Sequence, residues 1–414
     1  MNISLIIPSR NNLKYVKFAY SSIRKHLPID VELILLDDYS SDNTWEWMSE
    51  LSKTDKFIKI YRHGGPDRIG HTYLYDIGAE MASNDVIGIF HADMIATPNY
   101  INNMIKHIKP GVVVSGTRIE PPLHPPGPEK YVKDFGIEPE EFDETSFLKF
   151  VNEKENFHKD KTTTGIFAPW IIYKKDLLSI GGHDKKLFAP MELEDSDLFN
   201  RFLLTGYTLI QSRDAFVYHM TCRGSRFKDG IKITNEIPIG NGEVWKRAQD
   251  SNEYLQLRQI KFREWWRKWH TDVLHDENML PIVYKRYNVG FIINNINEQI
   301  LNMFEPWADT LYINNSEISK NYIENEQKIS NFNIKDRIKN LTDDKTNDVL
   351  IEFDARHLNN NSQIEFIKNL SKIIETSGEV GSFEYDIFQV TIKSMDSHEL
   401  SLINNEDFYK KYNL

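Results

Sequence analysis

The chain has 414 residues, a formal net charge of −11 and 40% hydrophobic residues. This length predicts two or three domains, and the apolar fraction excludes a mainly disordered chain. The excess of 61 Asp and Glu residues over 50 Lys and Arg residues argues against sequence-independent nucleic-acid binding, which needs a basic surface. The one cysteine, Cys222, cannot form an internal disulfide, which favours a reducing compartment.

The N-terminal apolar run, residues 3–7, is too short for the core of a signal peptide, and no basic region precedes it. No charge-free apolar stretch is long enough to span a bilayer. We therefore expect a cytoplasmic protein, or one attached to a membrane surface, with no transmembrane segment.

Strand-like and helix-like stretches alternate over the first 95 residues. Short apolar runs predict buried strands at 3–7, 31–36, 57–61 and 86–90. Helical spacing predicts helices at 15–26 and 70–82. A further helix is predicted to begin after Ser41 or Asp42, either of which can serve as its N-cap. This alternation is typical of βαβ units and predicts an α/β fold with a parallel sheet.

Polar side chains follow three of the predicted strands. Ser9 and Arg10 follow the first, Asp37 and Asp38 end the second, and Asp93 ends the fourth. In open α/β sheets, ligands bind beyond the carboxyl ends of the strands. The sequence therefore predicts a ligand site at this edge of the sheet.

The middle of the chain is less regular. Residues 120–139 are rich in Pro and Gly and predict a stiff loop, which either lies over the site or is a solvated connector. A strand is expected at 166–173, a helix at 193–204, and a long aromatic and basic helix at 244–270.

A new strand–helix–strand pattern begins after Pro281, with strands expected at 288–293, 310–313, 349–353 and 387–392 and helices at 298–304 and 362–374. We interpret residues 281–414 as a small α/β accessory domain. The stretch IEFDARH (351–357) faintly echoes GIFHADM (88–94), because each is a strand that ends near an Asp. From the sequence alone, we favour a chance similarity between these two stretches over a degenerate repeat of the first domain.

Five motifs occur in the order found in family 2 glycosyltransferases: IIPSRNN, LLDDYSSDNT, RIGHTYLYDIGAEMA, IFHADM and GGHDKKLFAPMELEDSDLFNRFLLTGY. The chain resembles this family over about residues 1–225, and residues 281–414 carry none of the resemblance. The resemblance implies that residues 1–280 form a domain with the GT-A fold. This fold is a Rossmann-like, mostly parallel sheet flanked by helices. We expect a nucleotide-sugar half at about 1–95, an acceptor half at about 96–225 and a closing helix at about 244–270.

The resemblance implies an inverting enzyme that moves a sugar from a nucleotide-diphosphate donor to a hydroxyl of a carbohydrate or another acceptor. A UDP-sugar is the expected donor. A divalent cation, Mn²⁺ or Mg²⁺, is implied to neutralise the leaving diphosphate. No nucleic-acid partner is expected.

The family's Asp-x-Asp motif reads His91-Ala92-Asp93 here. Asp93 matches the metal-binding acid. His91 replaces the first acid, and it is either a donor contact or a structural histidine. His219 matches a histidine that often completes the metal shell, and a plain strand-end histidine is the alternative.

Further roles follow from the resemblance. Asp195 matches the general base that takes the acceptor proton. Asp38 matches an acid that contacts the nucleobase, while Asp37 either helps it or supports the turn. The remaining implied donor contacts are Pro8, Ser9, Arg10, Arg68, Arg223 and Arg226. Of the last two, one is expected to be solvated.

Other interpretations stay open from the sequence. Trp170 and the group Trp265, Trp266 and Trp269 either form a platform for a sugar or, as we favour, belong to the core or an interface. A pyrophosphorylase-like nucleotidyltransferase would carry a glycine-rich loop after the first strand, where this chain reads PSRNN. A non-catalytic nucleotide-sugar-binding protein remains an alternative because His91 departs from the Asp-x-Asp motif.

Overall fold

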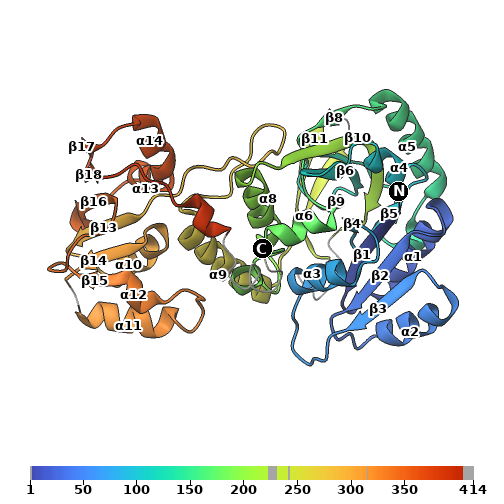
Figure 1. Ribbon diagram of the computed structural model, residues 1–414, viewed down its shortest axis with the longest axis horizontal. Coiled ribbons are helices and arrows are strands. Elements are labelled where there is room, and N and C mark those ends of the chain that lie inside the picture. Colours follow the sequence, from blue (N-terminus) through green and yellow to red (C-terminus); the bar gives the residue numbers. More distant parts are fainter. Residues whose placement is uncertain (1, 222–230, 241–242, 315, 404–414) are drawn as a thin grey trace.

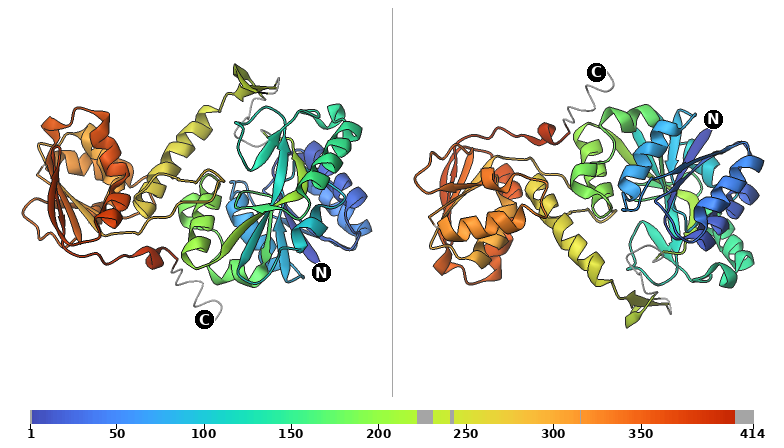
Figure 2. Two further views of the ribbon diagram at one scale, coloured as in Figure 1. Left: turned by 90° about the horizontal axis from the view of Figure 1, so that it is seen from above. Right: turned by 90° about the horizontal axis from the view of Figure 1, so that it is seen from below.

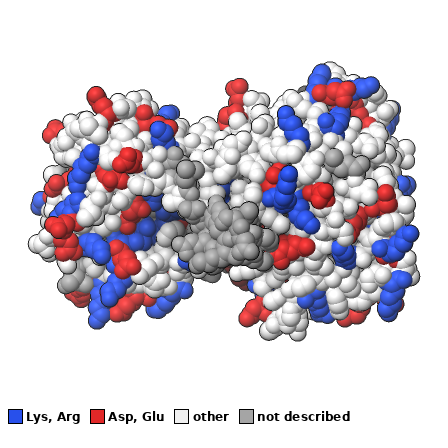
Figure 3. All heavy atoms as spheres, in the orientation of Figure 1, with Lys and Arg blue, Asp and Glu red and all other residues white. Residues whose placement is uncertain are grey.

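The computed structural model describes residues 2–221, 231–240, 243–314 and 316–403. Two sheets form two lobes, and helix α9 (Asn252–Trp269) runs from one toward the other (Figure 1). The N-terminal lobe holds a ten-stranded sheet and the C-terminal lobe a six-stranded sheet. Acidic and basic side chains are interspersed over both lobes on the face shown in Figure 3.

The N-terminal sheet has the strand order β3-β2-β1-β4-β9-β6-β10-β5, with β7 on β6 and β8 on β10. β1, β2, β3 and β4 are parallel, as are β6 and β10, whereas β9 is antiparallel to β4 and β6. The predicted α/β class with a mostly parallel sheet is therefore confirmed. The strands are β1 (Ile3–Ser9), β2 (Glu32–Asp37), β3 (Ile58–Arg62), β4 (Val86–Ile89), β5 (Met94–Ala96), β6 (Val112–Glu120), β7 (Lys130–Val132), β8 (Thr162–Thr163), β9 (Trp170–Tyr173) and β10 (Thr208–His219).

Eight α-helices accompany this sheet in the described part of the lobe: α1 (Leu13–His26), α2 (Thr44–Thr54), α3 (His71–Met81), α4 (Tyr100–Ile105), α5 (Glu144–His158), α6 (Lys174–Ser179), α7 (Lys185–Phe188) and α8 (Glu194–Leu204). In α1 the helical spacing buries Val16, Ala19 and Ile23, and its last turn is basic, which suits the helix dipole. The predicted N-cap of α2 is wrong, because the cap position is Asn43. Asp42 instead accepts a hydrogen bond of 3.0 Å from the Leu13 N–H and thereby ties α1 to the loop before α2.

The central strands are buried on both faces, as their continuous apolar runs predicted. Every residue of β2 is buried, and Leu33 and Leu35 are 0% exposed. Each such side chain contributes about 1.5–3 kcal/mol relative to an exposed one. The rigid centre of the sheet thus fixes the loops that follow β1, β2 and β4.

The C-terminal sheet has the order β15-β14-β13-β16-β18-β17. Its strands are β13 (Val289–Asn294), β14 (Thr310–Ile313), β15 (Ile338–Asn340), β16 (Val349–Asp354), β17 (Gly381–Tyr385) and β18 (Phe388–Ile392). The accompanying helices are α10 (Glu298–Phe304), α11 (Ser316–Glu326), α12 (Ile334–Arg337), α13 (Asn361–Lys368) and α14 (Leu370–Ser377). The single helix expected at 362–374 is two helices, because Asn369 ends α13 and caps α14.

Two other predicted elements are corrected. The helix expected at 244–270 begins only at Asn252, where the Ser251 side chain accepts from the Tyr254 N–H at 3.2 Å. The residues before it form a hairpin of β11 (Ile233–Gly240) and β12 (Glu243–Ala248), which stands out at the far end of α9 (Figure 2). The strand expected at 166–173 is shortened to β9, because Phe167 adopts a left-handed conformation with φ 81°.

Helix α9 joins the lobes through aromatic and ionic contacts. Trp265 and Trp269 are buried beside Phe188, and Trp266 stacks on Trp307 with ring centroids 5.0 Å apart. Together with the burial of Trp170, these contacts support the structural interpretation of the tryptophans. None of the described helices combines the length and the hydrophobicity that a membrane crossing requires.

Candidate active site

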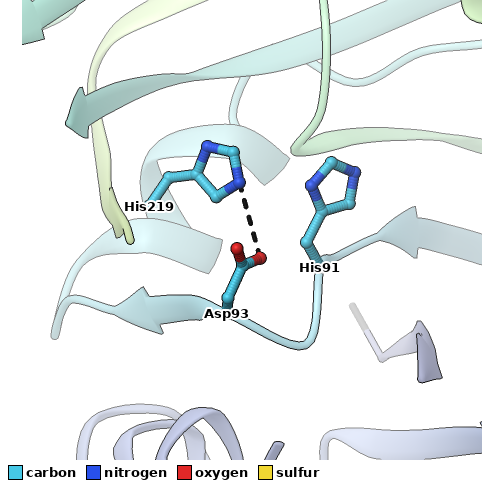
Figure 4. A group of neighbouring side chains, drawn as sticks. All are labelled: His91, Asp93 and His219. Carbon is cyan, nitrogen blue, oxygen red and sulfur yellow. Dashed lines mark ion pairs between the residues drawn. The ribbon is translucent and has the colours of Figure 1, made fainter. Parts of the chain in front are cut away.

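A His–Asp–His group lies where β4 and β10 end. Potential ligand atoms of His91, Asp93 and His219 all lie within 4.8 Å of one another. Figure 4 shows Asp93 and His219 pointing toward each other, with the His91 ring beside them. The Nε2 of His219 is 3.4 Å from the Asp93 Oδ1. This spacing suits two ligand atoms on one cation at about 2.1 Å each, so the group fits a divalent metal ion.

Glu120, at the end of β6, orients the His219 ring. Its side chain is 0% exposed, and its Oε1 lies 2.8 Å from the His219 Nδ1. Lys130 donates to the other carboxylate oxygen at 2.8 Å, and the Arg118 Nε lies 3.5 Å from the carboxylate. When Nδ1–H donates to Glu120, the neutral His219 ring presents the lone pair of Nε2 toward Asp93.

The two histidines have opposite pKa shifts. Burial and, after it, the neighbouring His219 lower the pKa of His91 to about 3. Burial also opposes the charged form of His219, but Asp93 and Glu120 outweigh it and raise the pKa of this ring to about 9. A divalent cation at the group would compete with the His219 proton, since only the neutral ring binds metal.

Asp195 lies in the first turn of α8 and is half-buried. Glu192 and Leu193 reach this turn through left-handed conformations, with φ 84° and 67°. Burial and the adjacent Glu194 raise the pKa of Asp195 to about 7. Glu194 is itself bonded to His71 at the start of α3. A carboxylate with a pKa near neutrality suits a general base.

Tyr75 of α3 packs against the His71 ring, with ring centroids 5.3 Å apart. It is 6% exposed, and burial raises the pKa of its phenol well above the usual value. The charges of Glu194, Asp195 and Asp93 raise it further. Because His71 also bonds to Glu194, α3 is tied to the start of α8 next to Tyr75.

The loop before α3 is held by Asp38. Both carboxylate oxygens of Asp38 accept backbone hydrogen bonds of 3.0 Å, from the N–H groups of Ile69 and Gly70. The guanidinium of Arg10 donates to the Asp38 carbonyl, and the Arg68 Nε lies 3.7 Å from the Asp38 carboxylate. The structure thus brings together Arg10, Asp38 and Arg68, and it shows that Asp38 shapes the loop.

Close packing fixes the same loop from the other side. Gly70 has φ +79°, and a Cβ there would lie 1.9 Å from the Pro190 carbonyl oxygen. Glycine alone fits this approach of α3 to the segment that leads into α8.

Other predicted donor residues lie at the ends of β1 and β2. Asp37 is 0% exposed and accepts from the Ser40 N–H at 3.1 Å, and the Arg62 Nε lies 3.2 Å away, so it supports the turn. Pro8 lies within β1, and Ser9 ends it. The buried Ser9 Oγ has no hydrogen-bond partner among the described residues and is available to a ligand. Arg223 and Arg226 lie outside the described residues.

The structure reveals three acids whose positions the sequence analysis missed. Glu120 ends the stretch VVVSGTRIE, whose three valines signal the start of a buried strand, and this signal could have placed Glu120 at the carboxyl edge. Asp76 of α3 holds the turn before α7 through the His183 ring at 2.7 Å and the Lys185 ammonium at 2.5 Å. Asp197 of α8 accepts from the Trp269 indole at 3.0 Å and anchors α9.

The mostly parallel sheet and the polar groups at its carboxyl edge define an α/β domain of the class in which ligands bind at that edge. Residues 4–179 match the model of Glycosyl transferase family 2, the family that the motifs in this part of the chain resemble. The match covers less than half of the 414 residues and none of the C-terminal lobe.

Two curated relatives and one solved structure illustrate the similarity. The chain is 31% identical over 112 residues to a dolichol-phosphate mannosyltransferase of Pyrococcus furiosus, covering 27% of this chain and 31% of the relative. It is 22% identical over 227 residues to the glycosyltransferase GlyG of Streptococcus pneumoniae, covering 54% of this chain and 72% of the relative. A crystal structure of GalNAc-T7 with UDP, GalNAc and Mn²⁺ is similar with a TM-score of 0.41 and 15% identity, covering 53% of this chain and 44% of that one. The chain spans about a third of the length of the first curated relatives that it matches.

Proposed function

We propose that the chain is an inverting glycosyltransferase that moves a sugar from a nucleotide-diphosphate donor to an acceptor hydroxyl. The family match over residues 4–179 supports the reaction class. The observation that carries the proposal is the group of His91, Asp93 and His219 at the carboxyl edge of the sheet, whose potential ligand atoms lie within 4.8 Å of one another. Asp195, in the first turn of α8, is the candidate base. UDP-sugar remains the expected donor, and a cytoplasmic location remains a prediction.

Asp93 and His219 are the proposed metal ligands. A bound Mn²⁺ or Mg²⁺ would supply positive charge to the diphosphate as it leaves. Glu120 would act through His219 by fixing the ring so that Nε2 faces the ion. The neutral His91 ring, beside His219, is available as a donor contact or as a further ligand.

Asp195 is the proposed base. The acceptor oxygen attacks the anomeric carbon on the face opposite the diphosphate, and the bond from that carbon to the diphosphate oxygen breaks. The acceptor proton passes to the Asp195 carboxylate. A pKa of about 7 keeps Asp195 ionised in much of the population at neutral pH while leaving it basic enough to take the proton.

Donor binding is proposed for the loops after β1 and β2. Ser9 offers a buried hydroxyl without a partner among the described residues, and Arg10, Asp38 and Arg68 meet at the start of α3. Arginine forks suit phosphate oxygens, while the Asp38 carboxylate retains acceptor capacity beyond its two amide bonds.

A transfer and donor-hydrolysis assay with a panel of UDP- and GDP-sugars and Mn²⁺ tests the proposal. Asp93→Ala should abolish turnover, and Asp195→Asn should keep donor affinity while lowering kcat by about 100-fold or more. The matched control is Asp30→Asn, an exposed acid that precedes β2 and therefore lies at the opposite edge of the sheet. Wild-type kcat in Asp195→Asn would contradict the base assignment. Nucleotide binding without turnover of any donor would instead favour a non-catalytic binding protein.

A further inference from the structure

The C-terminal sheet repeats the strand order of the nucleotide half of the N-terminal sheet. The order β15-β14-β13-β16-β18 corresponds strand for strand to β3-β2-β1-β4-β9. In each set the first four strands are parallel and the fifth is antiparallel to the fourth. The family match ends at residue 179 and does not extend to this lobe. The evidence for the repeat is therefore the strand order of the two sheets.

The register places the two similar sequence stretches at the same point of their sheets. GIFHADM includes the end of β4, which pairs with β1, and IEFDARH includes the end of β16, which pairs with β13. When Phe90 is matched with Phe353, His91 corresponds to Asp354 and Asp93 corresponds to Arg356. This agreement between sequence and topology favours the degenerate repeat over chance.

The corresponding edge of the C-terminal sheet has the geometry of a ligand site. The chain leaves β13 toward β14 on one side, and β16 lies on the other side, so the carboxyl ends of β13 and β16 form a topological switch point. Polar side chains gather there. Asn295 donates to the Asp354 carboxylate at 2.8 Å, and the Arg356 guanidinium pairs with the same carboxylate at 2.6 Å.

The residues at this edge differ from those of the N-terminal site in one decisive respect. A permanent cation, Arg356, stands where the N-terminal lobe has Asp93, the proposed metal ligand. Guanidinium binds phosphate oxygens through two parallel hydrogen bonds and supplies the charge that a metal ion would otherwise bring. The Arg356 side chain is 68% exposed, so its ion pair with Asp354 is weak and can rearrange around a ligand.

We propose that the carboxyl edge of β13 and β16 binds a nucleoside diphosphate, or the same group of a nucleotide sugar, without a metal ion and without catalysis. Arg356 binds the diphosphate, and Asp354 accepts from the ribose hydroxyls. The strands that carry Glu120 and His219 have no counterpart among the described residues of this sheet, so the edge lacks the means to activate an acceptor. The second site therefore senses the nucleotide that the first site uses or releases.

Isothermal titration of the full chain with UDP in EDTA tests this second site. The Asp93→Ala chain removes the first metal ligand, and the wild-type chain in EDTA serves if that variant does not fold. We expect the wild-type chain and the Asp93→Ala chain to bind UDP in the absence of metal. Arg356→Glu should weaken this UDP affinity about tenfold or more. Lys372→Glu, a charge reversal at another exposed position of the same lobe, should leave it unchanged.

Inorganic pyrophosphate is the second probe and should bind more weakly than UDP, because it lacks the ribose that Asp354 contacts. Equal affinity would overturn the nucleoside assignment. Absence of UDP binding in EDTA, or binding that Arg356→Glu leaves intact, would overturn the site. Because these titrations need neither metal nor turnover, their outcome is independent of the transfer assay.

Discussion

Replacing Glu120 by Gln tests how the candidate metal site is built. The substitution keeps the shape of the side chain and an oxygen that can accept from His219, but it removes the negative charge. In the structure that charge faces the His219 ring at 2.8 Å, the Lys130 ammonium at 2.8 Å and the Arg118 guanidinium at 3.5 Å. A less basic and less firmly oriented His219 should hold a cation more weakly.

Two magnitudes follow from this geometry. Loss of a partner behind a metal-binding histidine typically costs 10–100-fold in metal affinity, so Mn²⁺ affinity should fall by roughly that factor. Removing one member of a buried ion group leaves the others uncompensated, and the free energy of unfolding should fall by about 3 kcal/mol. Most domains keep a positive stability after such a loss, so the variant should still fold.

Titration of the metal-free protein with Mn²⁺ measures the affinity, and urea unfolding measures the stability. Glu129→Gln is the matched control, since Glu129 is also buried and pairs with Arg118 at 3.0 Å, but no contact joins it to His219 among those the structure shows. The control should lose stability and keep its Mn²⁺ affinity. A folded Glu120→Gln variant that binds Mn²⁺ as tightly as the wild type would refute the role of Glu120.

Two further predictions concern the base and the loop beside it. Because burial and Glu194 raise the pKa of Asp195 to about 7 and the base acts when ionised, kcat/KM should rise with pH and level off above about 7; a flat profile between pH 5 and 8 would contradict this. Gly70→Ala should lower the free energy of unfolding by about 2 kcal/mol or more, whereas Gly206→Ala, with φ +81° but open space around it, should cost less. Equal losses in urea unfolding would show that the contact with Pro190 does not matter.

The sequence predicted the elements whose signals are local. Continuous apolar runs located β1, β2 and β4, and helical spacing located α1 and α8, because burial of these elements follows directly from their own residues. The rule that ligands bind beyond the carboxyl ends of the strands also placed Asp38 and Asp93 at one edge, and in the structure they follow β2 and β4. Their proposed chemical roles remain predictions.

The remaining features depend on contacts between distant segments. Glu120 acts on His219, which lies 99 residues away in sequence, and no local pattern specifies that pair. The start of α9 was misplaced because basic and aromatic residues in β12 suit either a helix or an exposed hairpin, and pairing with β11 decides between them. Asp38 likewise appeared free to contact a nucleobase, whereas the fold engages both its oxygens with backbone amides.

The ionic contacts of α9 bear on how the chain can be cut. Arg267 is 1% exposed, and two of its carboxylate partners, Glu305 and Glu326, come from the C-terminal lobe. A shortened polypeptide that stops before residue 281 would remove both of these partners and leave Glu264 as the remaining acidic neighbour of Arg267. It would also expose to water the apolar Trp266 face that stacks on Trp307. Genetic dissection of the two lobes therefore needs compensating polar substitutions on α9, without which an inactive fragment would report misfolding instead of a missing activity.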